Sequence, residues 1–201
     1  MAGKRQSTED MEVFSKKELI YRIKRMPSQR DQALAAFIYL TGARISEILG
    51  TMKIIKRKDG TRKILKVRPL SKESVELKKE DGLIVVNNVP CLKRRKKLPK
   101  RNIPIVIHIE RKLVEIFWVY YRTLSPGEPL FNITRQRAWQ ILKKGMGIYG
   151  HYLIHERCTD LVKEHSFSDS YLKQFRGWAD TRMAATYTHL EYRDLARKMK
   201  N

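Results

Sequence analysis

Hydrophobic residues recur at three- and four-residue steps toward both ends of the chain, which is the period of helices that bury one face. The pattern predicts a short helix over residues 15–25, a strong helix over 30–39 and a third over 43–49. Pro27 ends the first of them, and Thr41-Gly42 separates the second from the third. After residue 108 we expect helices over residues 109–124, 134–144, 151–163, 171–176, 181–188 and 192–200, with Thr134 as an N-cap.

Between residues 51 and 108, shorter apolar runs indicate strands. Two Asp-Gly dipeptides are hairpin turn signals, and the expected strands span residues 52–57, 62–67, 74–77, 83–92 and 101–107. We therefore predict an α+β fold that is mainly helical, with a small antiparallel sheet on one edge. Residues 1–27 are expected to form a tail and a short helix, and residues 28–201 one main domain.

The charge balance indicates a binding function in addition to a fold class. Lys and Arg total 43 and Asp and Glu total 21, so the net charge is +22. Such a surface attracts polyanions, and nucleic acid is the expected partner. An anionic membrane surface and a ribosomal-type structural role are the alternatives that charge alone leaves open.

The remaining composition favours a soluble intracellular protein. No apolar run reaches the roughly 20 residues that span a bilayer, and the N-terminus lacks the apolar core of a signal peptide. Cys91 and Cys158 lie far apart and have no CxxC partner. They are interpreted as ordinary thiols in a reducing compartment, with no disulfide framework or metal site.

Three motifs carry the candidate chemistry. They are Thr41-Gly42-Ala43-Arg44-Ile45-Ser46-Glu47-Ile48-Leu49, then His151-Tyr152-Leu153-Ile154-His155, then Gly177-Trp178 with Tyr187 nine residues further on. In this order and spacing they resemble the tyrosine recombinase and integrase superfamily over about residues 28–200. The first and third motifs match closely and the second in part. The resemblance implies a tyrosine-recombinase catalytic domain over residues 28–201.

Tyr187 is the candidate nucleophile, because attack by its phenolate oxygen on phosphorus gives a covalent intermediate that a DNA hydroxyl can reverse. The resemblance implies a 3′-phosphotyrosine and a reaction that needs neither metal nor ATP, hence no cofactor. Arg44 would hold the scissile phosphate through its guanidinium group. Glu47, three residues further along the same helix face, can orient Arg44 or simply pair with it at the surface.

A basic turn lies between the first two motifs. In the family, a lysine in this turn acts as general acid toward the leaving 5′ oxygen. Its usual distance from the strand Ile103-Pro104-Ile105 indicates Lys96, with Lys97 and Lys93 as alternatives. The other basic residues of the turn are expected to grip the DNA backbone without chemistry. The expected DNA-binding set is Lys93, Arg94, Arg95, Lys97, Lys100 and Arg101.

The second motif departs from the family pattern. His151 matches a histidine that transfers a proton or contacts phosphate, and Trp178 matches a position that holds His or Trp. The family has a second catalytic arginine three residues after His151, but this chain has Ile154. Arg157 lies one helical turn further on and could replace the missing guanidinium, or it could be a structural or DNA-backbone arginine. For Trp178, core packing is an equal alternative.

The resulting prediction is a site-specific recombinase or integrase that cuts and rejoins double-stranded DNA. The resemblance implies a homo-tetramer on paired sites, and it leaves room for a monomeric isolated domain off DNA. We expect a cytoplasmic protein, or one in the host cytoplasm or nucleoid if viral. Three alternatives stay open: a topoisomerase-like strand-relaxing enzyme, a catalytically impaired DNA-binding relative, and a basic structural protein of RNA complexes.

Chain length is a second departure. Most family members carry an N-terminal helical domain that clamps the other side of the DNA, whereas only residues 1–27 precede the first core helix here. The chain is therefore expected to be either a compact member or a separated catalytic fragment.

Overall fold

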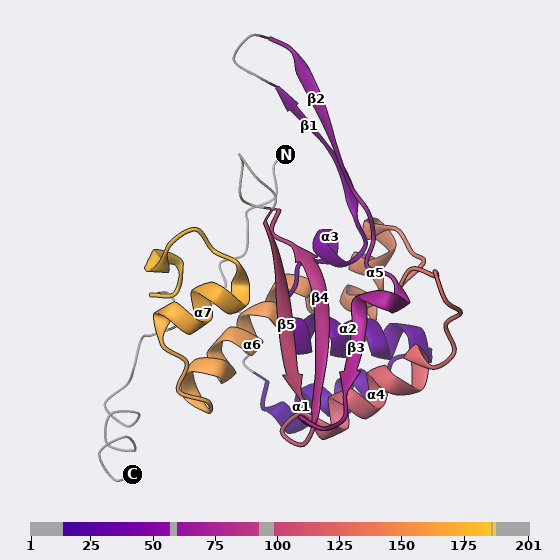
Figure 1. Cartoon of the computed structure of the whole chain (residues 1–201). Coiled ribbons are helices and arrows are strands. Elements are labelled where there is room, and N and C mark those ends of the chain that lie inside the picture. The colour runs from indigo at the N-terminus through magenta and orange to yellow at the C-terminus, as the bar shows by residue number, and fades with distance from the viewer. Residues whose placement is uncertain (1–13, 57–59, 93–98, 186, 188–201) are drawn as a thin grey trace.

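The computed structural model describes residues 14–56, 60–92, 99–185 and 187. A helical body carries a sheet along one side, and a two-stranded ribbon projects away from it (Figure 1). The helices are α1 (Lys16–Lys24), α2 (Gln29–Thr41), α3 (Ile45–Ile48), α4 (Arg111–Tyr121), α5 (Arg135–Met146), α6 (Gly150–Lys163) and α7 (Asp169–Arg176). The strands are β1 (Thr51–Lys56), β2 (Arg62–Val67), β3 (Val75–Lys78), β4 (Leu83–Pro90) and β5 (Lys100–Val106), and short 3₁₀ turns span Lys72–Ser74 and Thr181–Met183.

Side-chain caps explain where several helices begin. The hydroxyl oxygens of Ser15, Ser28, Thr134 and Ser168 each accept a hydrogen bond from the backbone N–H three residues further on. Such a cap satisfies one of the N–H groups that the first helical turn leaves without a partner. The expected cap at Thr134 is confirmed.

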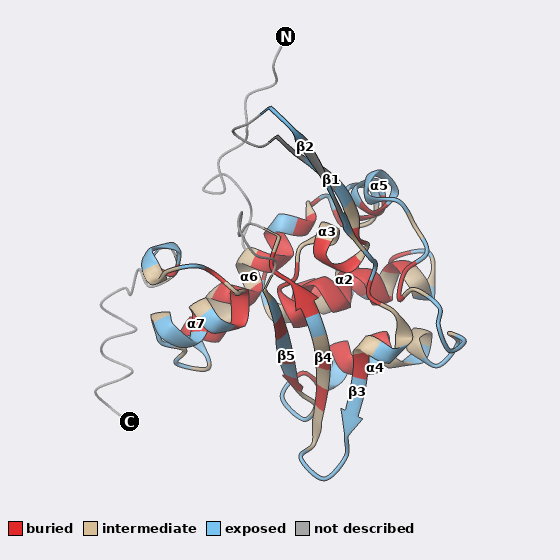
Figure 2. Ribbon diagram, turned by 45° about the horizontal axis from the view of Figure 1, so that its top comes forward, coloured by how far each residue is buried: buried red, intermediate tan, exposed pale blue. Residues whose placement is uncertain are grey.

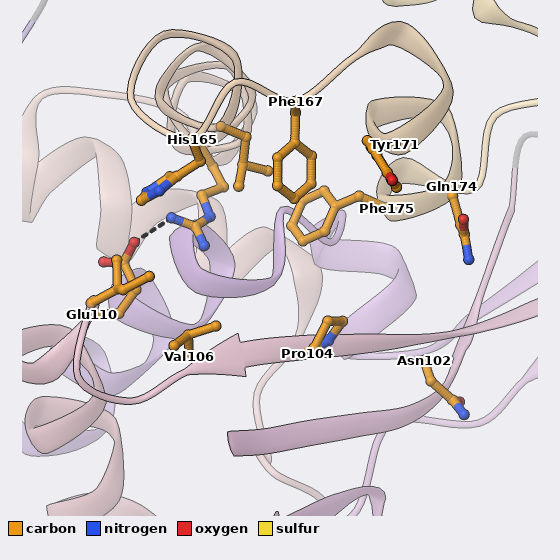
Figure 3. Close-up of a pocket in the computed structure, with 12 residues that line it drawn as sticks. Asn102, Pro104, Val106, Glu110, His165, Phe167, Tyr171, Gln174 and Phe175 are labelled. Atoms are coloured by element: carbon orange, nitrogen blue, oxygen red, sulfur yellow. Dashed lines mark hydrogen bonds and ion pairs between the residues drawn. The ribbon is translucent and has the colours of Figure 1, made fainter. Parts of the chain in front are cut away.

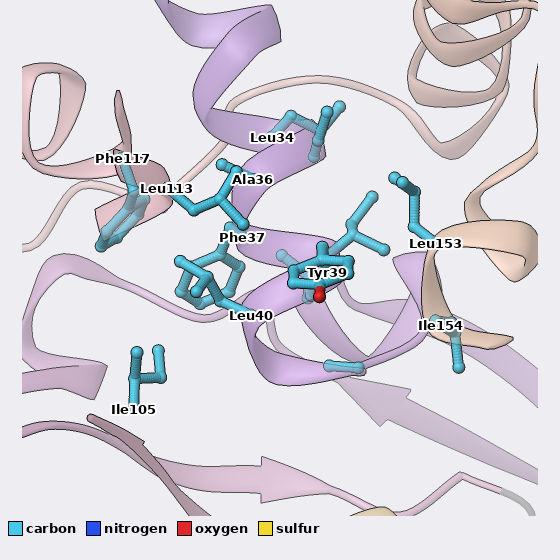
Figure 4. Packing of buried hydrophobic residues seen from close by; sticks show 14 of the residues in the cluster. Leu34, Ala36, Phe37, Tyr39, Leu40, Ile105, Leu113, Phe117, Leu153 and Ile154 are labelled. Atoms are coloured by element: carbon cyan, nitrogen blue, oxygen red, sulfur yellow. The ribbon is translucent and has the colours of Figure 1, made fainter. Parts of the chain in front are cut away.

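Helix α2 is the centre of the core. Every residue from Ala33 to Thr41 is buried, so the helix is enclosed on all sides, as Figure 2 shows. The Phe37 ring packs against Phe117 of α4 at 4.8 Å between ring centroids and against Phe131 at 5.8 Å. Leu153 and Ile154 of α6 approach the same helix from another side (Figure 4).

Strands β3, β4 and β5 form one antiparallel sheet, in that order. Alternate residues of β5 are buried, among them Ile103 and Ile105, so one face of the sheet covers the helical body. The predicted α+β class, with a small antiparallel sheet on one edge, is confirmed.

The first hairpin does not join this sheet, although the sequence suggested that all the strands would lie together. Strands β1 and β2 pair only with each other, with Ile54 opposite Ile64. Both isoleucines and Met52 are more than half exposed, so the described part of the chain lays nothing over this face of the ribbon. The alternating apolar pattern therefore predicted the strands correctly but not their separation from the sheet.

The helix expected over residues 181–188 is, among the described residues, a 3₁₀ turn over Thr181–Met183. The helix expected over 192–200 lies outside the described residues. Within the ranges given above, none of the helices is long and apolar enough to cross a membrane.

Candidate active site

Arg44 owes its position to a sharp turn at the end of α2. Gly42 ends that helix in the left-handed conformation, with φ of 56°. A Cβ atom there would also lie 2.9 Å from Cε1 of Phe175, so the site favours glycine in both conformation and space. Two residues later, Arg44 is the N-cap of α3, and its side chain is partly exposed.

The buried carboxylate of Glu47 holds Arg44 through hydrogen bonds. The Arg44 Nη1 donates to Glu47 Oε1 at 2.8 Å, and the Arg44 backbone N–H donates to Oε2 at 3.0 Å. The expected pairing is therefore present, and because Glu47 is fully buried it orients Arg44 from the interior.

The same carboxylate reaches two further elements. Arg101 Nη2 of β5 donates to Glu47 Oε2 at 3.1 Å, and the Leu92 backbone N–H donates to Oε1 at 3.3 Å. Burial raises the pKa of Glu47, but Arg101 and Arg44 outweigh it and hold that pKa below its usual value. Glu47 is thus a charged hub that ties Arg44 to β5 and to the start of the basic turn.

Tyr187 lies among aromatic rings of the second and third motifs. Its ring centroid is 4.5 Å from that of His155 and 5.9 Å from that of Trp178, with which it stacks. Burial and the neighbouring Cys158 raise the pKa of Tyr187 to about 12, against the opposing charges of Arg176 and Arg44. The hydroxyl is therefore protonated at neutral pH, and two guanidinium groups act on it electrostatically.

Arg176 is the last residue of α7 and is almost fully buried, with 2% of its surface exposed. Gly177 follows it in the left-handed conformation, where a Cβ atom would meet the Cys91 Sγ at 2.3 Å. The Arg176 guanidinium lies 5.6 Å from the Trp178 ring. Its Nε and Nη1 meet no hydrogen-bond acceptor among the described residues.

Arg101 differs from its expected role in gripping DNA. It is 8% exposed, and besides its bond to Glu47 it donates Nη1 to the Cys91 Sγ at 3.2 Å. The reason is the alternation of β5, which turns Arg101 inward together with Ile103 and Ile105. Lys100, its neighbour, is exposed as expected.

Arg157 also lies elsewhere than the replacement hypothesis requires. It is 5% exposed, forms a close ion pair with Glu110, and lies over the Tyr39 ring at 5.4 Å. Arg157 lies one helical turn beyond Ile154 on α6 and pairs with Glu110, which follows β5. Ile154 itself is buried in the core. This placement supports the structural alternative for Arg157.

Other predicted residues are placed as follows. His151 is exposed in the first turn of α6, and Trp178 is buried. Five predicted residues of the basic turn lie outside the described residues: Lys93, Arg94, Arg95, Lys96 and Lys97.

Sequence reasoning missed two residues that the fold brings beside Tyr187. His155 closes the second motif, so its position in that motif was the available signal. Arg176 follows the apolar positions Leu172 and Phe175 on one helix, and a cation on such a face was the signal there.

A separate cavity of about 500 Å³ opens between β5 and the segment from α6 to α7 (Figure 3). The Glu110–Arg157 pair lies at one end, and Phe167 and Phe175 line the apolar part. Neither Arg44 nor Tyr187 lines it. Within the described ranges, no group of three or more His, Cys, Asp or Glu side chains could hold a metal ion.

The chain is similar to known proteins both in sequence family and in fold. The model of the phage integrase family matches residues 11–194, whereas no curated protein sequence matches. A XerH site-specific recombinase bound to palindromic difH substrate is similar at 17% identity and a TM-score of 0.62, over 92% of this chain and 52% of that one.

Two further solved structures are similar. A XerA recombinase has 19% identity and a TM-score of 0.59, over 100% of this chain and 66% of that one. A Tn1549 transposon integrase in complex with transposon right-end DNA has 14% identity and a TM-score of 0.55, over 95% and 67%. At such identities the likeness is one of fold. The chain spans about half the length of the XerH structures.

Proposed function

Because the chain belongs to the phage integrase family, we propose that it cuts and rejoins DNA strands through a covalent bond to Tyr187. The observation that carries the proposal is the setting of that tyrosine. Its ring packs against His155 and Trp178, and the charges of Arg44 and Arg176 act on it.

The proposed step is a transesterification. The Tyr187 oxygen forms a bond to phosphorus while the bond from phosphorus to the 5′ oxygen breaks, which leaves a 3′-phosphotyrosine and a free 5′ hydroxyl. The phenol must lose its proton and the leaving oxygen must gain one. Rejoining is the reverse step with a second 5′ hydroxyl, so the phosphodiester energy is kept and neither ATP nor a metal is required.

Several residues of the candidate active site would contribute to this transesterification. Arg44, which donates a hydrogen bond to Glu47, would neutralise charge on the phosphate oxygens. Lys96, with Lys97 and Lys93 as alternatives, would give a proton to the leaving oxygen. His151 is exposed in the first turn of α6, where it could contact phosphate. Trp178 would keep the Tyr187 ring in place by stacking.

Duplex DNA is the proposed substrate. The net charge of +22 supports a polyanion, and the similar XerH and Tn1549 integrase structures are complexes with DNA. We propose that the protein assembles as a homo-tetramer on paired sites, is monomeric off DNA, and acts in the cytoplasm or nucleoid. The basic turn and Lys100 would grip the backbone.

A second candidate function is a DNA-binding relative with impaired chemistry. The observation that favours it is Ile154, which is 2% exposed and cannot bind phosphate. Such a protein would bind the same DNA without forming an adduct. A strand-relaxing enzyme, in contrast, would form an adduct but act without site preference.

The test is covalent trapping without metal. A duplex with a nick close to the cleavage position loses the short 5′-hydroxyl fragment, so the adduct accumulates. We expect a protein–DNA band on a denaturing gel with the native chain, none with Tyr187→Phe, and an unchanged band with the control Tyr171→Phe, because Tyr171 is exposed and lies on α7.

The outcomes separate the candidates. A band that requires Tyr187 supports strand exchange, and its restriction to certain sequences argues against a relaxing enzyme. The absence of a band from every duplex tried, with salt-sensitive binding retained, supports the impaired relative and overturns the proposal.

A further inference from the structure

We propose that Arg176 is a catalytic residue that binds the scissile phosphate, in place of the arginine that Ile154 displaces. This inference rests on the proposed function of the site. The second phosphate-binding guanidinium group would then come from the end of α7, directly before Gly177-Trp178, and not from α6.

The position of Arg176 supports this role. A Cβ atom built on Gly42 would lie 3.4 Å from Arg176 Nη1, so the guanidinium group lies against the turn that leads to Arg44. The guanidinium group also lies 5.6 Å from the Trp178 ring, which itself stacks on Tyr187. Arg176 thus lies close both to the turn that leads to Arg44 and to the ring that stacks on Tyr187.

The guanidinium group of Arg176 has unused hydrogen-bonding capacity. Arg176 is 2% exposed, yet its Nε and Nη1 meet no acceptor among the residues that the structure describes. Buried polar groups are nearly always hydrogen-bonded, and a buried cation without an anion is costly. A ligand with several anionic oxygens would supply the missing acceptors.

Groups close to Arg176 cannot supply that anion. Both oxygens of Glu47 are already occupied by Arg44, Arg101 and the Leu92 N–H. Burial raises the pKa of the Cys158 thiol to about 11, so at neutral pH it carries no charge. Arg44 and Arg101 add positive charge around Arg176, which favours a phosphate further.

Arg157 provides the contrast. It is an equally buried arginine, but Glu110 already pairs with it. Arg157→Met is therefore the matched control for Arg176→Met, because each change removes one buried guanidinium group and only one of them is expected to face the phosphate.

The first experiment measures anion binding without catalysis. Thermal unfolding is followed in inorganic phosphate and in sodium chloride of equal ionic strength. We expect phosphate to raise the melting temperature of the native chain and of Arg157→Met above that in chloride, and this difference to vanish in Arg176→Met. A difference that survives in Arg176→Met overturns the inference, and so does its absence from the native chain.

The second experiment measures adduct formation on two nicked duplexes, one with a normal scissile phosphate and one with a neutral methylphosphonate there. We expect Arg176→Met to slow the reaction at the phosphate by about 100-fold or more. At the methylphosphonate the loss should be much smaller, because less charge needs neutralising. Equal losses on both duplexes would mark Arg176 as structural and overturn the inference.

Arg176→Lys keeps the charge but not the guanidinium fork, so it should recover part of the rate that Arg176→Met loses if the positive charge acts on the phosphate. The two experiments also separate the two proposals. If the native chain forms no adduct while its phosphate response depends on Arg176, the strand-exchange function fails and the anion-binding role of Arg176 stands.

Discussion

Four hydrogen bonds from three residues converge on the buried carboxylate of Glu47, and they come from α3, β5 and the segment after β4. Since Arg44 holds its position through this carboxylate, a change at Glu47 should disturb both folding and catalysis.

Glu47→Gln should lower the free energy of unfolding by about 3 kcal/mol or more at pH 7, because it leaves Arg101 buried without its anion. The arginines hold the pKa of Glu47 below its ordinary value of 4.5 in the folded protein. The stabilisation is thus fully present above pH 4.5 and is lost as pH falls through the lower folded pKa.

Urea unfolding of both proteins over a range of pH would measure this. The gap between native and Glu47→Gln should close as the pH drops below 4.5. The control is Glu115→Gln, which breaks an exposed pair with Arg111 on α4 and should change little at any pH. A gap that stays constant into acid would contradict the assignment of Glu47 as a charged hub.

At the scale of elements, the β1–β2 ribbon begins three residues after α3, so it projects from beside the helix whose N-cap is Arg44 (Figure 1). Residues 51–68 contain eight basic residues and one acidic residue. A two-stranded ribbon has the dimensions to enter a major groove of DNA. The ribbon is therefore expected to contact DNA beside the cleavage site.

Replacing Lys66 and Arg68, both exposed, with Gln should weaken DNA binding and flatten its salt dependence. Each lost phosphate contact should reduce the slope of log K against log salt by about 1. The control pair is Lys79 and Lys112, which lie beside β3 and on α4, away from the ribbon (Figure 1). Equal effects of the two pairs would indicate that only the total charge matters.

Sequence patterns predicted the elements of the whole molecule well, because local periodicity and caps decide them. The cap at Thr134 and the helices around α2 are examples. The patterns failed where contacts distant in sequence decide. Arg101 was assigned to DNA from its place in a basic run, yet Glu47, 54 residues away, holds it inside. The same reason left the role of Arg157 open and Arg176 without a prediction, since no local pattern shows which buried cation pairs with an anion.

The candidate site depends on the core as a unit, because α2 leads directly into the turn that positions Arg44. Helix α2 packs against α4, α5, α6 and β5, so unfolding of any one of them exposes it. The domain should therefore unfold in one cooperative transition, with loss of the active-site geometry at the same point.

Phe37→Ala tests this coupling. The ring is fully buried between Phe117 and Phe131, so its removal should cost about 3–5 kcal/mol of unfolding free energy. Val119→Ala, on an exposed position of α4, should cost no more than about 0.5 kcal/mol. Tryptophan fluorescence in urea gives both values. Adduct formation by Phe37→Ala should be retained at low temperature and vanish on heating together with the fluorescence transition. If adduct formation vanished well before that transition, the site would be unfolding separately from the core, and the coupling would be wrong.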